Sequence, residues 1–251
     1  MSPPRNRSDR ASEFYEPRIL DCGDSALSVD FGNFIDPQVN ARVMALDAAL
    51  SARSIPGVVE AVPSYRALMV HVDPCRVDFD ELRHTLLELA SSSGQVGLRR
   101  QRWVVPVVYG GAFGEDLEVL ATRHGLSNTQ LIDLHSAPVY RVYMVGFMPG
   151  FSYLGGMDAR LRTPRRTQPR PSAPASSISI GGSQSAIGSL PAPSGWHLIG
   201  RTPVRPFMPS RTPQFLFQPG DEIVFDPIAE RRWNALDAAA AAGETVAQPA
   251  S

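Results

Sequence analysis

The distribution of proline constrains the fold of this chain more than any other feature. The sequence of 251 residues contains 23 prolines, and most of them lie from Pro106 onward. Proline breaks the interior of helices and is confined to the edges and ends of strands. We therefore predict two domains of different construction, residues 15–100 and 101–230, with a boundary near residue 100.

Residues 15–100 alternate between strand and helix patterns. Strand patterns, in which small or apolar side chains alternate with polar ones or form short apolar runs, occupy residues 26–31, 58–62 and 67–72. Asp36 and Pro37 supply an N-cap and a first-turn proline for one helix. Asp78 and Glu81 resemble a capping box for a second helix. The order β-α-β-β-α predicts a ferredoxin-like α+β domain.

From Trp103 onward the chain consists of short β-rich pieces separated by proline and glycine. Strand patterns occupy residues 104–109, 140–147, 177–180, 197–199, 215–217 and 222–225. A helix is predicted over 115–124, and a second one begins at Ser127, which forms a capping box with Gln130. Short strands with few helices predict a mainly β domain that closes into a small barrel or sandwich.

The two ends of the chain are predicted to lie outside these domains. Residues 1–14 are polar and basic and predict a disordered tail. Residues 231–251 are predicted to form a second, Ala-rich tail, with a frayed helix over residues 238–251 as the alternative. The N-terminal arginines are followed by no apolar stretch, so a secretory signal is not expected. No window approaches the roughly 18 apolar residues that a membrane helix needs. We expect a cytoplasmic protein without a membrane partner.

Charge and cysteine content exclude several classes of protein. The formal net charge is −1, which gives no electrostatic basis for binding nucleic acid or a membrane surface. Cys22 and Cys75 show neither metal-ligand spacing nor a disulfide framework. None of the five histidines pairs with another at metal-ligand spacing, so no metal site is predicted.

Three segments have compositions suited to a ligand site. Residues 146–156 combine glycines with aromatic side chains, among them Phe151 and Tyr153. Glycine allows close approach of a ligand, but a tight barrel corner would have the same composition. Residues 160–170 contain five arginines, including Arg165 and Arg166. Arginine binds carboxylate or phosphate through a bidentate fork, and the alternative is a solvated loop.

The third segment joins residues 180–188 to 193–203. Gln184 and Ser185 lie beside glycines, and His197 can donate, accept or relay a proton near neutral pH. A single histidine that follows a tryptophan is often structural, so both interpretations of His197 stay open. The residues alone predict a β-rich domain with a glycine-rich cleft lined by arginine.

Several long motifs resemble one known family. They are residues 140–158 (YRVYMVGFMPGFSYLGGMD), 162–165 (RTPR), 195–203 (GWHLIGRTP), 19–27 (ILDCGDSAL), 63–66 (PSYR) and 105–117 (VPVVYGGAFGEDL). The chain resembles the allophanate hydrolase subunit 1 family, the C and D subdomains of a carboxyltransferase domain, which includes the B subunit of 5-oxoprolinase and the sporulation kinase A inhibitor. The resemblance covers about residues 18–228 and implies a ferredoxin-like domain followed by a cyclophilin-like β-barrel.

The resemblance also implies a function. It suggests the B subunit of a heteromeric 5-oxoprolinase, a hydrolase that opens the 5-oxoproline lactam to glutamate. ATP would be used by the complex and not held tightly by this chain. The implied partners are a second carboxyltransferase-like barrel subunit and, for 5-oxoprolinase, a third lactam-utilisation subunit. The alternatives are an allophanate hydrolase or urea-carboxylase-type subunit and, with less support, a binding protein that inhibits a histidine kinase.

We predict that one cleft in the barrel gathers the candidate residues. Arg165 and Arg201 would orient a carboxylate or phosphate, Gln184 would hold the amide, and His197 could relay a proton. The predicted catalytic residues are His197, Gln184 and Arg201, and the predicted substrate-binding residues are Phe151, Tyr153, Arg165, Arg166 and Ser185.

Overall fold

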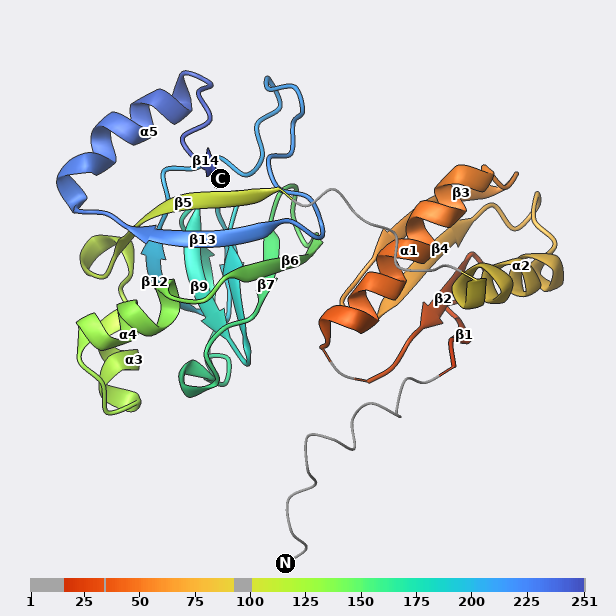
Figure 1. Cartoon of the computed structure of the whole chain (residues 1–251), viewed down its shortest axis with the longest axis horizontal. Coiled ribbons are helices and arrows are strands. Elements are labelled where there is room, and N and C mark those ends of the chain that lie inside the picture. The colour runs from red at the N-terminus through yellow and green to blue at the C-terminus, as the bar shows by residue number, and fades with distance from the viewer. Residues whose placement is uncertain (1–15, 34, 93–100, 251) are drawn as a thin grey trace, which may run out of the picture. The chain divides into compact units, whose positions relative to one another are not determined.

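The structure is a computed structural model that describes residues 16–33, 35–92 and 101–250. The chain divides into two compact units, residues 1–98 and 99–251 (Figure 1). This division lies two residues from the predicted boundary. The predicted tail at residues 1–14 lies outside the described residues.

The first unit is a four-stranded antiparallel sheet with two helices. Its elements are β1 (Arg18–Asp21), β2 (Ala26–Asp30), α1 (Pro37–Arg53), β3 (Val58–Pro63), β4 (Ala67–Val72) and α2 (Phe79–Ser92). The strand order is β1-β2-β4-β3. Helix α1 begins as predicted, because the Asp36 carboxylate accepts hydrogen bonds from the backbone N–H groups of Gln38 and Val39.

The core of this unit forms between the helices and the sheet. Val39, Val43 and Leu46 of α1 are fully buried in one cluster with apolar side chains of β2, β4 and α2. Strand β1 was not predicted, because its four residues are mostly exposed and show no burial pattern. It occupies the edge of the sheet beside β2. The predicted order β-α-β-β-α corresponds to β2 through α2.

The second unit is built around a β-barrel. Its strands are β5 (Arg102–Tyr109), β6 (Tyr140–Val145), β7 (Ser152–Gly155), β9 (Ser177–Gly181), β10 (Gln184–Ile187), β12 (His197–Arg201), β13 (Glu222–Pro227) and β14 (Gln248–Pro249). The pairing runs β12-β9-β10-β7-β6-β13-β5, and β12 also pairs with β5, so the described strands close into a ring. Closure leaves no edge in this ring. This confirms the predicted barrel.

Side elements extend the barrel. Helices α3 (Leu117–Arg123) and α4 (Asn128–Ser136) follow β5, and α4 has the predicted capping box between Ser127 and Gln130. Strands β8 (Arg170–Ala173) and β11 (Ala192–Ser194) pair in a separate two-stranded ribbon.

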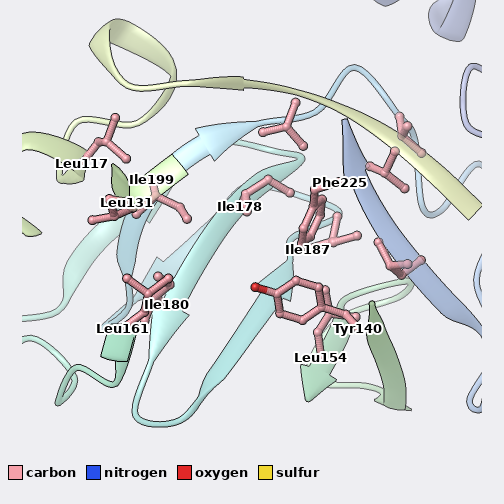
Figure 2. Packing of buried hydrophobic residues seen from close by; sticks show 14 of the residues in the cluster. Leu117, Leu131, Tyr140, Leu154, Leu161, Ile178, Ile180, Ile187, Ile199 and Phe225 are labelled. Carbon is pink, nitrogen blue, oxygen red and sulfur yellow. The ribbon is translucent and has the colours of Figure 1, made fainter. Parts of the chain in front are cut away.

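The barrel interior is filled by large apolar side chains. Figure 2 shows Tyr140, Leu154 and Ile187 together with isoleucines from β9 and β12. Strand β9 has the sequence SISIG, and its two isoleucines are buried in this core. Because strand side chains alternate between faces, Ser177 and Ser179 point to the other face, where they line a cavity.

Two predictions for this unit are wrong. Residues 215–217 do not form a strand, and Phe215 makes only an isolated bridge to Phe207. The Arg211 guanidinium donates to the carbonyls of Arg205, Pro206 and Pro213, and these hydrogen bonds hold the segment as a loop.

For the Ala-rich end of the chain, the prediction of a tail is wrong, and the helix that was its alternative is present. Trp233–Ala241 form helix α5, and β14 pairs with β5. Ala247 is buried in the barrel core. An Ala-rich segment gives little pattern, so its place in the fold was not visible in the sequence.

The position of Ala247 predicts a large effect of a charge at this residue. Ala247→Asp should lower the free energy of unfolding by about 3 kcal/mol or more, because it buries a carboxylate without a partner. Ala241→Asp, on an exposed position of α5, should change it little. Denaturation monitored by tryptophan fluorescence measures both, and equal stability of the two variants would show that the C-terminal segment is a tail.

Candidate functional site

A cavity of about 290 Å³ opens on the barrel unit beside the ribbon of β8 and β11. Its lining residues come from four parts of the sequence. They include Phe147, Phe151 and Tyr153, the arginines Arg165 and Arg166, the β9 serines Ser177 and Ser179, and residues 192–196. None of the lining residues carries a carboxylate. The cavity, here called the aromatic cavity, therefore combines aromatic, hydroxyl and cationic groups.

Aromatic rings form one continuous row along the cavity. The ring centroids of Phe147 and Phe151 are 5.6 Å apart, those of Phe151 and Tyr153 are 4.7 Å apart, and those of Tyr153 and Trp196 are 6.0 Å apart. Such edge-to-face and tilted contacts stabilise aromatic clusters. Burial raises the pKa of the Tyr153 hydroxyl, an effect that the charge of Arg165 opposes. The phenol therefore stays protonated near neutral pH and can donate a hydrogen bond.

Trp196 lies against a glycine of the barrel. A Cβ atom added at Gly181 would lie 2.4 Å from the indole ring, so only glycine fits at this position. On the cavity side, the Arg165 guanidinium lies 5.6 Å from the centre of the same indole ring. This is a cation–π contact. Trp196 thus connects the barrel wall to residues 160–170, here called the arginine segment.

The buried carboxylate of Asp116 fixes the arginine segment. Asp116 Oδ1 lies 3.1 Å from Arg166 Nη1 and 2.6 Å from Arg170 Nη2. Asp116 Oδ2 accepts a 2.7 Å hydrogen bond from the backbone N–H of Leu198 on β12. Arg170 also pairs with Glu115 at 2.8 Å. The carboxylate therefore holds α3, the arginine segment and β12 together.

Asp116 was not predicted as a functional residue. It lies at the N-cap of α3, but its side chain makes no capping hydrogen bond. The one sequence feature that could have indicated a role for Asp116 is its position within the motif at residues 105–117. An aspartate at a helix start is usually explained by capping, and that explanation is incorrect here.

The sequence matches the carboxyltransferase domain family, subdomain C and D, over residues 17–217. The chain belongs to this family. It is 38% identical to the B subunit of 5-oxoprolinase from Bacillus subtilis (strain 168) over 229 residues, which cover 87% of this chain and 95% of that protein. The match confirms the family that the motifs predicted.

Solved structures of similar proteins agree with this family. A crystal structure of TTHA0988 is 37% identical with a TM-score of 0.73 and covers 81% of this chain. This chain spans only 40% of that protein's length. The Kluyveromyces lactis urea amidolyase has a TM-score of 0.80 and 16% identity, covering 93% of this chain and 16% of that chain, which establishes similarity of fold alone.

The structure brings half of the predicted site residues of this carboxyltransferase-family chain to one cavity. Phe151, Tyr153, Arg165 and Arg166 line it. Gln184, Ser185, His197 and Arg201 do not line it, so the structure does not form the single cleft that we predicted.

Ser185 lies in the barrel interior. Its hydroxyl donates to the carbonyl of Ser179 and lies 2.9 Å from Nε2 of the buried His135. The Tyr109 hydroxyl lies 2.8 Å from His135 Nδ1. All three groups are satisfied if Nε2–H donates to Ser185 and the Tyr109 hydroxyl donates to Nδ1. This arrangement makes His135 a neutral, structural residue.

The other three residues also make contacts outside the cavity. His197 Nε2 lies 3.0 Å from the Pro164 carbonyl, to which it donates. The Arg201 guanidinium lies 5.0 Å from the centre of the Trp233 ring, and its Nε donates to the Ala175 carbonyl. Gln184 begins β10 opposite Gly181, after the two-residue loop of Gly182 and Ser183. A glycine with φ of +66° in such a loop is typical of a tight hairpin.

Two features are absent from the part of the chain that the structure describes. Across the described ranges, no group of three or more histidine, cysteine or acidic side chains is placed to hold a metal ion. Among the described helices, none has both the length and the hydropathy to cross a membrane.

Burial of His135 predicts a pH dependence of barrel stability. Burial lowers its pKa to about 3, against roughly 6.5 when exposed. As the pH falls, the unfolded state therefore binds the proton first. The stability that neutral His135 contributes is complete above about pH 6.5 and is lost as the pH falls towards 3. Between these two pH values, His135 alone should raise the unfolding equilibrium constant about tenfold for each unit by which the pH falls.

The measurement is urea denaturation between pH 7 and pH 4, followed by tryptophan fluorescence. The three tryptophans, Trp103, Trp196 and Trp233, all belong to the barrel unit. His135→Gln should show a shallower pH dependence than the wild-type protein. Identical slopes would contradict the assignment of a neutral histidine.

Proposed function

We propose that this chain is the B subunit of a heteromeric, ATP-dependent 5-oxoprolinase and that it acts in the cytosol. One observation carries the proposal, the 38% identity to a protein named as the B subunit of 5-oxoprolinase over 95% of that protein's length. We also propose that the first unit has a ferredoxin-like fold and that the barrel is cyclophilin-like, as the resemblance implies.

The chemistry of the aromatic cavity supports this substrate class. 5-Oxoproline is a small ring with a carboxylate and a lactam amide. The Trp196 ring and the neighbouring aromatic side chains offer an apolar surface to the ring, and Arg165 offers a cation to the carboxylate. In the described part of the chain, Arg165 belongs to none of the ion pairs, so its charge is available to a ligand.

ATP is proposed as a co-substrate of the complex that is not tightly bound by this chain. A lactam is a poor electrophile, and phosphoryl activation would make its opening favourable. The residues of this chain would bind and orient the lactam and exclude water from the aromatic side of the cavity.

Partner subunits are part of the proposal. We propose a second carboxyltransferase-like barrel subunit and a third lactam-utilisation subunit. The comparison with TTHA0988 supports this, because the match covers only 40% of that longer protein and the rest of it has no counterpart in this chain. Urea or allophanate as substrate has weaker support, since the similarity to urea amidolyase establishes the fold alone. No contact among the described residues favours inhibition of a kinase.

The proposed role of Arg165 is tested in the reconstituted enzyme. Arg165→Ala should lower kcat/KM for 5-oxoproline mainly through a higher KM. The expected loss is about 10- to 10²-fold, because a hydrogen bond to a charged group contributes about 1.5–3 kcal/mol.

Arg201→Ala is the matched control. It removes an arginine that contacts Trp233 outside the cavity, so it should lower Tm and leave kcat/KM near the wild-type value. If Arg201→Ala loses turnover and Arg165→Ala does not, the site lies elsewhere than in the aromatic cavity.

The substrate itself is tested genetically. Deleting the gene for this chain should abolish growth on 5-oxoproline as the nitrogen source, and growth on urea should continue. Loss of growth on urea with normal use of 5-oxoproline would assign the chain to the allophanate or urea pathway instead.

A further inference from the structure

A second cavity, of about 350 Å³, adjoins the aromatic one. It shares Arg165 and Arg166 with that cavity and adds Arg123 from the end of α3 and His197 from β12. Its remaining lining residues are Pro164, Thr167 and Gln168. The second cavity, here called the basic cavity, is thus lined by three guanidinium groups and an imidazole, without a carboxylate.

The charges around the basic cavity do not balance within the protein. Arg166 and Arg170 are offset by Asp116 and Glu115. In the part of the chain that the structure describes, the ion pairs include neither Arg123 nor Arg165. Two positive charges therefore face this region without a protein counter-ion. A phosphoryl group carries about −1.5 to −2 charges near pH 7 and matches them.

A neighbouring histidine responds to the same positive potential. The pKa of His124 is lowered, first by burial and then by the charges of Arg123 and His197. His124 Nε2 lies 2.8 Å from Thr163 Oγ1, which itself donates to the Leu161 carbonyl. Nε2–H is therefore the donor in this contact, and the neutral imidazole adds no charge of its own to the cavity.

The segment that lines the basic cavity is held at three points. His197 donates to the Pro164 carbonyl, the Arg166 backbone N–H donates to the Gly195 carbonyl at 2.7 Å, and the Arg166 side chain pairs with Asp116. Groups held in place before a ligand binds lose less entropy on binding. The arginine segment is thus an organised part of the structure and not a freely solvated run of charge.

We propose that the basic cavity binds the phosphoryl group of a small molecule whose apolar part occupies the adjoining aromatic cavity. Arg165 lines both cavities and would contact both parts of such a ligand. Arg123 would bind the phosphoryl oxygens alone, because it lines only the basic cavity. The two cavities together fit a phosphorylated small amide. That the ligand is an amide rests on the proposed function.

The test uses the full chain and inorganic phosphate as the probe, with binding followed by NMR chemical shifts at pH 7.5. Arg123→Gln should weaken phosphate binding at least about tenfold. Arg162→Gln is the matched control, since Arg162 is exposed, belongs to the same arginine segment and lines neither cavity. It should bind phosphate as the wild-type chain does. Thermal melting verifies that both variants fold.

Absence of saturable phosphate binding, or an equal loss in Arg162→Gln and Arg123→Gln, would overturn the proposal. Two additions identify the source of the phosphoryl group. If 5-oxoproline binds together with phosphate, the ligand is an activated amide, whereas displacement of phosphate by a lower concentration of ADP indicates a nucleotide. Phosphate binding by the chain alone does not depend on oxoprolinase activity, so either proposal can fail without the other.

Discussion

The site depends on the ion pairs and hydrogen bonds of one buried carboxylate, that of Asp116. It binds two arginines and accepts a hydrogen bond from the backbone N–H of Leu198. The backbone N–H of Asp116 in turn donates to the Leu198 carbonyl. A charge at this depth is stable only when several donors satisfy it. Because those donors come from the arginine segment and β12, the carboxylate sets the position of Arg166 and, through the segment, of Arg165. Both cavities form on the segment that this one residue holds.

Local signals in the sequence predicted much of the fold. Asp36 with Pro37, and Ser127 with Gln130, marked helix starts through hydrogen bonds within one turn. Residues 177–180, now in β9, were predicted as one of the short β-rich pieces between proline and glycine. Residues of β10 were instead assigned to a ligand site, because Gln184 and Ser185 lie beside glycines. The pairing of β10 with β7 and β9 depends on closure of the barrel, and local composition carries no information about a distant partner strand.

The site was predicted less completely, for a related reason. Composition identified the segments that carry aromatic and arginine side chains, and Phe151, Tyr153, Arg165 and Arg166 line one cavity. The direction of a side chain on β12 could not be read from alternation, because its pairing with β9 shifts register between Leu198 and Gly200. Arg201 contacts Trp233 instead of the cavity, and that contact depends on the C-terminal segment, whose place in the fold was not visible in the sequence. Asp116 was missed because its partners lie 50 to 82 residues away in sequence.

We propose, above all, that the cavity between the aromatic row and the arginine segment holds the substrate of the enzyme. Hydrogen–deuterium exchange of the reconstituted complex, with and without 5-oxoproline, tests this most directly. We expect slower exchange on adding 5-oxoproline in peptides that cover residues 164–171 and 192–198, with no change around the Gly182–Ser183 hairpin or in α5. Slower exchange confined to the hairpin and α5, or to the partner subunits, would contradict this placement of the substrate.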